Sequence, residues 1–213
     1  MSNLLILGAG GHAKVIADAA YAMRTWQSIC FLDDKNISNT VSPDSKISIV
    51  GKFKDLPKLR KDFSDAVVAI GDNKQRARLI AQCQDLGFSL PVIIHHHSWV
   101  SKSAKIGLGS VVFAGVVINA SAQIGVGSIV NTAAIIEHDC IIEDYVHISP
   151  NAALAGAVKV GEYSWIGIGA SVIHKITIGR NVIIGAGAAV IGNISDNVVA
   201  VGVPAKIIKA NNF

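Results

Sequence analysis

Charged residues are scarce in this chain: Asp, Glu, Lys and Arg make up 16% of its 213 residues, whereas apolar residues make up 51%. The apolar residues are nevertheless dispersed, and no uninterrupted run reaches the length of about 18 that a membrane-spanning helix requires. The opening stretch MSNLLILGAGGHAK has no basic segment and reaches its glycines early, which is atypical of a secretory signal. These absences predict a protein that is soluble and cytoplasmic, with no membrane partner.

Cysteine is equally sparse. Cys30, Cys83 and Cys140 are odd in number and form no Cys-x-x-Cys pair, which favours a reducing compartment over a disulfide framework. The net charge of +4 is not gathered into a Lys/Arg cluster, so no nucleic-acid partner is expected.

A period of six residues dominates the second half of the sequence. Every sixth residue from Ile106 to Val190 is aliphatic, and the residue two before each is small or aliphatic. Six matches neither the 3.6 of an α-helix nor the 2 of a flat strand. It fits a solenoid with three six-residue faces, in which coils of 18 residues stack about 4.8 Å apart. Glycines that follow the aliphatic position, such as Gly107 and Gly161, are interpreted as easing the turns.

The handedness of the coil does not follow from the period, and the general crossover rule favours a right-handed one. The pattern [LIV]-G-x-x-[small]-x, however, resembles that of the hexapeptide-repeat acyltransferases. The resemblance implies a left-handed parallel β-helix that associates into a trimer.

The first half predicts a nucleotide-type module. NLLILGAGGHAKVIADAAYAM indicates a strand, a glycine turn and a helix, with the spacing Gly8-x-Gly10-x-x-Ala13. A second strand ends at Asp33 and Asp34, and a later strand is followed by a turn at Gly71. The exposed N–H groups at such a helix start form an anion site. A glycine turn that merely packs helix against strand is the alternative interpretation.

About 90 residues precede the repeat, roughly half of a full dinucleotide fold, so a mononucleotide with a diphosphate fits better than NAD. The predicted fold class is therefore an α/β Rossmann-like half-domain over residues 1–92, followed by a left-handed parallel β-helix with a closing segment over residues 93–213.

Taken together, the segments GAGGHAK, FLDD, IGDN, IEHDC, VHIS and GVPAK resemble bacterial sugar acetyltransferases. That group includes sialic acid O-acetyltransferases and bacillosamine-type UDP-amino-sugar N-acetyltransferases. The resemblance implies acetyl-CoA as co-substrate, no metal, and a nucleotide-linked amino sugar as acceptor. No long loop interrupts the repeat, so the N-terminal domain is expected to hold the acceptor.

His138 and Asp139 form the candidate catalytic pair. The register points His138 outward, with Ala120 one coil below and Gly156 one coil above, so small residues leave space around the imidazole. A lone histidine on a repeat face is usually an ordinary surface residue, but IEHDC resembles the family's catalytic motif. The resemblance implies that His138 is the general base and that the following carboxylate increases its basicity. Asp139 stands where the bacillosamine-type relatives are expected to have glutamate.

His147 lies nine residues after His138, which is one and a half faces around the coil. The two histidines can therefore meet only between neighbouring subunits. By resemblance, His147 and the Gly156 N–H hold the acetyl end of acetyl-CoA, and Ile168 and Ala186 line the pantetheine groove.

In the N-terminal domain the resemblance implies that Gly10, Gly11 and His12 contact the nucleotide-sugar. Asp33, Asp34 and Gly71 complete the predicted substrate site. Lys206 and Lys209 follow the repeat and either meet CoA phosphates or are ordinary solvated lysines.

The predicted activity is acetyl transfer to an amino group, at C4, of a UDP-linked dideoxy amino sugar. Sialic acid or other sugar O-acetylation is the nearest alternative. A trimeric zinc hydratase of the γ-carbonic-anhydrase type would need closely spaced histidines, and the chain offers no His-x₄-His pair. A non-catalytic scaffold solenoid would leave the His138–Asp139 pair without a task.

Overall fold

The computed structural model describes residues 2–34 and 48–211. The chain divides into two compact units, Met1–His96 and His97–Phe213. No helix in the described ranges is both long and apolar enough to cross a membrane.

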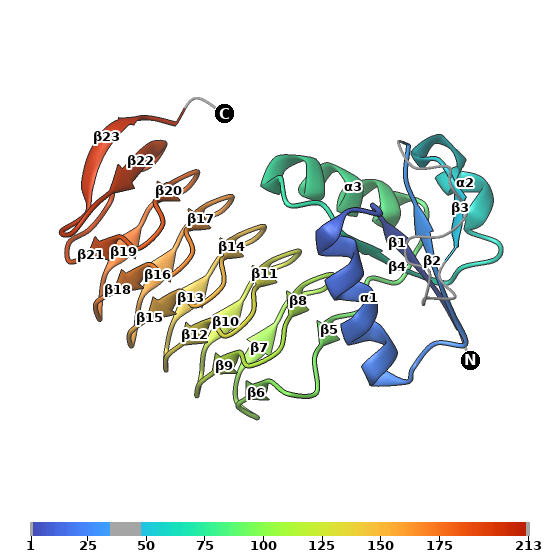
Figure 1. Ribbon diagram of the computed structural model, residues 1–213, viewed down its shortest axis with the longest axis horizontal. Coiled ribbons are helices and arrows are strands. Elements are labelled where there is room, and N and C mark those ends of the chain that lie inside the picture. The colour runs from blue at the N-terminus through green and yellow to red at the C-terminus, as the bar shows by residue number, and fades with distance from the viewer. Residues whose placement is uncertain (1, 35–47, 212–213) are drawn as a thin grey trace. The chain divides into compact units, whose positions relative to one another are not determined.

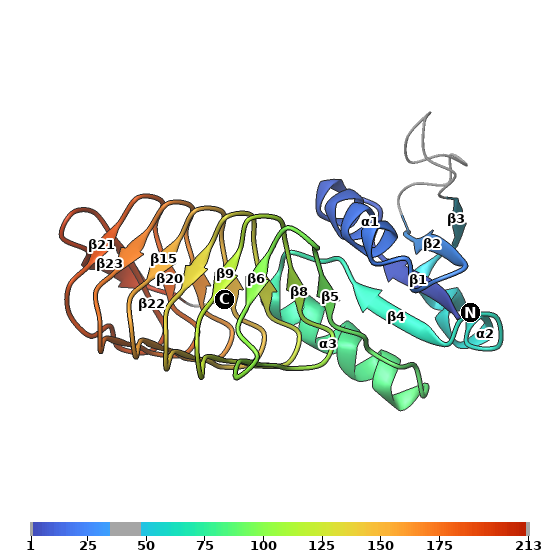
Figure 2. The same ribbon diagram turned by 90° about the horizontal axis from the view of Figure 1, so that it is seen from below.

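The first unit contains a parallel four-stranded sheet in the order β3-β2-β1-β4 (Figure 1). The strands of this sheet are β1 (Asn3–Leu7), β2 (Ser28–Leu32), β3 (Ile49–Gly51) and β4 (Asp65–Val68). The short strand β5 (Ile93–Ile94) lies near the end of the unit and is not part of this sheet. The helices are α1 (Gly11–Met23), η1 (Phe53–Asp55), α2 (Leu56–Leu59) and α3 (Asn73–Asp85). Figure 2 shows α1 and α3 on opposite faces of the sheet.

The order of the strands places a switch point between β1 and β4. The chain proceeds from β1 outward to β2 and β3, then returns to pair β4 with the other side of β1. β1 is central and its apolar residues Leu4, Leu5, Ile6 and Leu7 are fully buried. In open α/β sheets ligands bind outside the carboxyl ends of the strands at such a point, which here carries the turns after Leu7 and Val68.

The second unit is a left-handed parallel β-helix built from two-residue strands (Figures 1 and 2). Residues pair with those 18 positions later, as Gln123 does with Ile141, so the predicted coil length and uninterrupted register are confirmed. The three faces run β19-β16-β13-β10-β7, β21-β18-β15-β12-β9-β6 and β23-β22-β20-β17-β14-β11-β8.

The strands of the β-helix have the following bounds: β6 (Trp99–Val100), β7 (Lys105–Ile106), β8 (Val111–Val112), β9 (Val117–Ile118), β10 (Gln123–Ile124), β11 (Ile129–Val130), β12 (Ile135–Ile136), β13 (Ile141–Ile142), β14 (His147–Ile148), β15 (Ala153–Leu154), β16 (Lys159–Val160), β17 (Trp165–Ile166), β18 (Ser171–Val172), β19 (Thr177–Ile178), β20 (Ile183–Ile184), β21 (Ala189–Val190), β22 (Val198–Val201) and β23 (Lys206–Ala210). β22 and β23 form the antiparallel hairpin that closes the unit.

The second residue of each repeated strand points into the coil, and these aliphatic side chains form the core. Ile118, Ile136, Leu154 and Ile166 are fully buried. Serines at the small position are satisfied within this apolar interior: the Ser164 hydroxyl donates to the Gly179 carbonyl at 2.7 Å. The core is therefore continuous from coil to coil, with its few polar groups hydrogen-bonded.

The glycines after the aliphatic position act differently from the prediction. Every sixth residue from Gly109 to Gly187 has a positive φ, and most of these residues are not glycine. Gly107 and Gly161 lie elsewhere in the turn and are required by close approach. A Cβ on Gly107 would lie 2.6 Å from the backbone of Gly125, and one on Gly161 would lie 2.6 Å from the backbone of Arg180. These glycines allow coils to stack, rather than the backbone to turn.

Candidate active site

His138 lies on the turn between β12 and β13, where coils above and below fix the backbone. The Asp139 N–H donates to the Ala120 carbonyl at 3.0 Å, and the Ala157 N–H donates to the His138 carbonyl at 2.9 Å. Asp139 occupies the positive-φ position of its turn, at φ 59°. Asp adopts this conformation more readily than most residue types, so it places a carboxylate beside the histidine with little strain.

The two side chains are in contact and open to solvent. His138 Nδ1 and Asp139 Oδ2 are 2.8 Å apart, and both side chains are 61% exposed, as the outward register predicts. An ionised carboxylate only accepts hydrogen bonds, so Nδ1 carries the proton that it donates to Asp139. In the neutral ring the lone pair then resides on Nε2, the atom able to accept a proton from a substrate.

Gly156, one coil above, makes room for the imidazole. A Cβ on this residue would lie 2.6 Å from both Cε1 and Nε2 of His138. A side chain there would therefore displace the ring from its place beside Asp139. The structure thus brings Gly156 to the predicted base.

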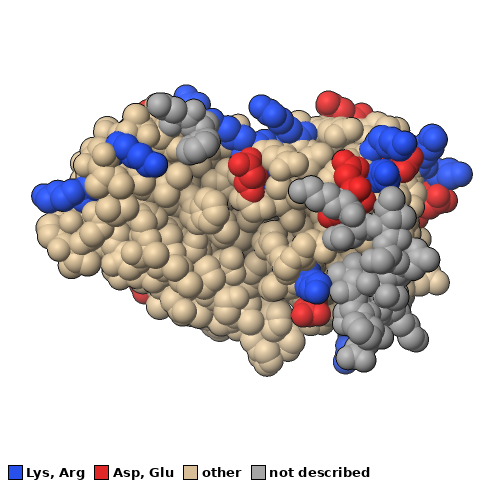
Figure 3. All heavy atoms as spheres, turned by 45° about the horizontal axis from the view of Figure 1, so that its top comes forward, with Lys and Arg blue, Asp and Glu red and all other residues tan. Residues whose placement is uncertain are grey.

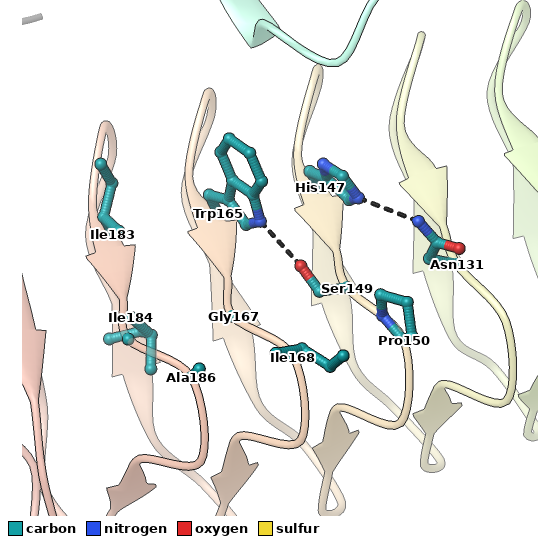
Figure 4. A pocket seen from close by; sticks show the side chains of 11 residues that line it. Asn131, His147, Ser149, Pro150, Trp165, Gly167, Ile168, Ile183, Ile184 and Ala186 are labelled. Carbon is teal, nitrogen blue, oxygen red and sulfur yellow. Dashed lines mark hydrogen bonds between the residues drawn. The ribbon is translucent and has the colours of Figure 1, made fainter. Parts of the chain in front are cut away.

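A groove crosses a different face of the β-helix, over β14, β17 and β20 (Figure 4). Its volume is about 420 Å³. Three of the residues predicted to bind the co-substrate line it together: His147, Ile168 and Ala186. Its other lining residues are Asn131, Ser149, Pro150, Trp165, Gly167, Ile183, Ile184 and Gly185. The groove is long, mostly apolar and polar chiefly at one end.

The polar end is an ordered set of side chains around His147, which is only 8% exposed. Asn131 Nδ2 lies 3.3 Å from His147 Nε2. The indole of Trp165 stacks on the imidazole with ring centres 4.8 Å apart and planes 17° from parallel. The Trp165 N–H in turn donates to Ser149 Oγ at 2.7 Å. The sequence interpretation named His147 but missed Asn131, Ser149 and Trp165. The only signal for these three in the sequence is that each lies about one coil away from the residue that it contacts.

In the first unit the glycines after β1 have separate roles. Gly8 has φ +113°, and a Cβ there would lie 2.9 Å from the Ala69 carbonyl oxygen, so this glycine permits close packing of the two turns. A Cβ on Gly10, Gly11 or Gly71 would meet no heavy atom within 4 Å among the described residues. These three predicted substrate residues therefore border open space at the switch point.

Asp33 and Asp34, predicted to hold the nucleoside, both accept hydrogen bonds from the backbone. Asp33 Oδ2 accepts from the Ala9 N–H at 2.8 Å and thereby braces the glycine turn. Asp34 Oδ1 accepts from the Phe53 N–H at 2.9 Å, where η1 begins. The two carboxylates therefore hold the backbone at the edge of the predicted substrate site in place.

His12 lies in the first turn of α1, and its ring is neutral at neutral pH. Burial, together with the smaller effect of the nearby Arg76 guanidinium, lowers the pKa of His12 to about 4. Arg76 is 1% exposed and donates to the carbonyls of Ile70 and Gly71 at 3.0 and 3.1 Å. The sequence interpretation missed this arginine, which fixes the Gly71 turn. A neutral His12 can contact a phosphate only through an N–H hydrogen bond.

Within residues 2–34 and 48–211, no group of three or more His, Cys, Asp or Glu side chains is arranged to hold a metal ion.

Comparison with known proteins gives two family matches: residues 3–83 match the PglD N-terminal domain, and residues 157–192 match the bacterial transferase hexapeptide (six repeats). The GDP-perosamine-bound PerB of Caulobacter crescentus, also in complex with CoA, is 41% identical, with 98% of each chain covered and a TM-score of 0.91. The acetyltransferase domain of PglB from Neisseria gonorrhoeae, in complex with acetyl coenzyme A, is 41% identical over 97% of this chain and 99% of that one, with a TM-score of 0.93.

The chain belongs to the bacterial hexapeptide-repeat sugar acetyltransferases. A curated relative, UDP-N-acetylbacillosamine N-acetyltransferase of Bacillus subtilis, is 44% identical over 117 residues. That match covers 54% of this chain and about half, 52%, of the relative. Membership in this acetyltransferase family confirms the fold class and the family expected from the hexapeptide register and the glycine turns.

Proposed function

We propose that this acetyltransferase transfers the acetyl group of acetyl-CoA to the amino group of a nucleotide-linked amino sugar. The observation that carries the proposal is the His138–Asp139 pair, which is exposed on a turn and has its imidazole close against Gly156. A sugar amine is protonated in water and becomes a nucleophile only after losing a proton. His138 Nε2 accepts that proton, and Asp139 holds the ring in the tautomer that can do so.

The remaining steps need no group on the enzyme to become acylated. The amine nitrogen attacks the thioester carbonyl carbon, a C–N bond forms, and the C–S bond breaks. The sulfur leaves as the CoA thiolate and takes up a proton. Both required catalytic roles, removal of a proton and alignment of two substrates, are within reach of the residues described.

The groove over β14, β17 and β20 is proposed as the acetyl-CoA site. His147 lies at its polar end, where a thioester carbonyl can be oriented, and Ile168 and Ala186 offer an apolar wall to the pantetheine arm. The Gly156 N–H is proposed to help hold the acetyl end. Lys206 and Lys209 are exposed on β23 and remain candidates for contact with CoA phosphates.

The acceptor is proposed to bind to the first unit, at the open carboxyl edge bordered by Gly10, Gly11, His12 and Gly71. The relatives act on different nucleotide sugars by name: UDP-N-acetylbacillosamine in Bacillus subtilis and GDP-perosamine in Caulobacter crescentus. For this chain we propose a UDP-linked dideoxy sugar acetylated on its C4 amino group. Both named relatives are N-acetyltransferases, which favours nitrogen over oxygen as the acceptor atom.

A homotrimer is proposed as the working form. The described β-helix exposes many large apolar side chains: Trp99, Leu108, Ile135, Trp165, Ile168, Ile173, Ile191, Val203, Ile207 and Ile208. Figure 3 shows a broad tract of the β-helix surface without Lys, Arg, Asp or Glu. Apolar surface on this scale is typical of an interface. The free thiols of Cys30, Cys83 and Cys140 are compatible with the proposed cytoplasmic location.

The test is a panel of UDP-, GDP- and dTDP-linked amino sugars incubated with acetyl-CoA, with release of free thiol followed over time. We expect turnover with a UDP-linked 4-amino sugar and none with the matching 4-hydroxy sugar. The His138→Ala variant is the control for non-enzymatic release. Turnover with sialic acid alone would establish the O-acetyltransferase alternative, and activity abolished by zinc chelation would establish a metal-dependent one.

A further inference from the structure

Trp165 is the largest side chain in the groove, and the proposed reaction gives it no task. It is the first residue of β17, where the side chain points out of the coil, and it remains 39% exposed. The residues paired with it on the adjoining coils are His147 and Ile183. An indole therefore projects from the groove wall between a histidine and a smaller aliphatic side chain (Figure 4).

The orientation of this indole is fixed at two places. Its N–H donates to Ser149 Oγ at 2.7 Å, and its face stacks on the His147 imidazole at 4.8 Å. A hydrogen bond at one edge together with a stack on one face leaves the ring little freedom to rotate. The indole is thus a preset part of the groove.

The groove beside Trp165 has a backbone floor. Gly167 follows two residues later, and a Cβ there would lie 2.5 Å from the Ile184 carbonyl oxygen. No side chain can therefore replace the glycine without shifting the next coil. The groove is therefore bordered by the indole and, at Gly167, by a stretch of backbone that cannot take a side chain.

We propose that Trp165 determines the acyl-chain length that the enzyme accepts, and that it restricts the donor to acetyl-CoA. The inference rests on the proposed function, in which the acyl group lies at His147. Any group held there lies alongside the indole that covers one face of this histidine. An acetyl group ends in a single methyl, whereas propionyl and butyryl groups add one and two methylenes that require the space of the ring.

The experiment compares kcat/KM for acetyl-, propionyl- and butyryl-CoA with one amino-sugar acceptor. For Trp165→Ala we expect the butyryl-to-acetyl ratio to rise by roughly tenfold or more, since one methylene in an apolar pocket changes discrimination by about 10- to 200-fold. Trp165→Phe keeps an aromatic ring and should raise the ratio less. Ser149→Ala removes the hydrogen-bond acceptor of the indole N–H and should raise the butyryl-to-acetyl ratio, by less than Trp165→Ala does.

Trp99→Ala is the matched control. Trp99 also begins a two-residue strand and is 65% exposed, but it lies on the sheet of β6 rather than that of the groove. Its removal should leave the acyl preference unchanged. As a measure of ligand contact, CoA should alter the tryptophan fluorescence of the wild type and of Trp99→Phe, and this change should be largely lost in Trp165→Phe.

Failure of the inference differs from failure of the proposed function. A wild type that acetylates an amino sugar, with an unchanged acyl ratio in Trp165→Ala, would overturn the inference alone. A wild type that releases no thiol with any amino sugar would overturn the proposed function and the inference with it. If Trp165→Ala does not fold, the acyl ratios of Trp165→Phe and Ser149→Ala decide, and unchanged ratios in both overturn the inference.

Discussion

At the scale of single residues, the proposed base pair His138–Asp139 allows proton removal to be tested separately from substrate binding. His138→Ala removes Nε2 but leaves the groove and the first unit intact. We therefore expect the loss in kcat, by roughly 10²- to 10⁴-fold, with both substrates still bound. Single-turnover kinetics, in which chemistry limits the rate, is the measurement.

Asp139→Asn is the companion variant, because Asn tolerates the positive φ of 59° at this position. Its amide can donate to Nδ1 and so leave the proton on Nε2, the wrong tautomer for a base. The imidazole remains, so kcat should fall by less than in His138→Ala. A His138→Ala enzyme with near-wild-type single-turnover rates would remove His138 as the base. An Asp139→Asn enzyme of unchanged kcat would show that the carboxylate does not control the ring.

At the scale of elements, the turn between β1 and α1 contains one glycine that the fold needs and two that face open space. Gly11→Ala adds a methyl that meets no described atom within 4 Å, so the fold should persist while a diphosphate at the helix start is crowded. We expect an increase in acceptor KM and little change in acetyl-CoA KM. Steady-state kinetics with each substrate varied is the measurement.

Gly8→Ala is the contrasting variant, because its new Cβ would lie 2.9 Å from the Ala69 carbonyl and its φ is +113°. It should lower thermal stability, whereas Gly11→Ala should not. An acceptor KM unaffected by Gly11→Ala would place the acceptor elsewhere.

The β-helix shows which features of the fold the sequence could predict. A six-residue repeat fixes which side chain of each strand is buried and which residues pair 18 positions apart, so coil and register were predictable before any contact was known. Handedness was not, since the general crossover rule favours the opposite hand and only family resemblance gave the correct one. The prediction that Gly107 eases the turn was wrong, because the sequence does not reveal how closely two backbones approach.

The site was predictable only in part, for a related physical reason. His138 and His147 stand in motifs, whereas Ile168 and Ala186 were named through the family resemblance. The structure brings His147, Ile168 and Ala186 to one groove. Trp165 and Arg76 act through contacts with side chains or carbonyls that no local motif encodes. Their importance depends on where stacked coils or adjacent turns bring those partners, which a single sequence does not state.

At the scale of the whole molecule, the two histidines proposed to act in the reaction, His138 and His147, lie on different parts of the coil. His147 belongs to β14, whereas His138 lies on the turn from β12 to β13, so the two side chains serve different faces. A reaction that uses the base at His138 and the donor at His147 must then combine residues from two chains. A cyclic trimer provides three such combinations, each made by a chain and its neighbour.

Mixed trimers of two inactive variants test this arrangement. A His138→Ala chain supplies an intact His147, and a His147→Ala chain supplies an intact His138. Every trimer containing both kinds has one interface where the intact residues meet, so random mixing of equal amounts should restore roughly a quarter of wild-type activity. Co-expression with two different affinity tags isolates the mixed trimers, and sedimentation verifies their mass. The control mixes each variant with a differently tagged copy of itself and should stay inactive. Mixed trimers without activity, or a wild-type monomer that is fully active, would show that each chain works alone.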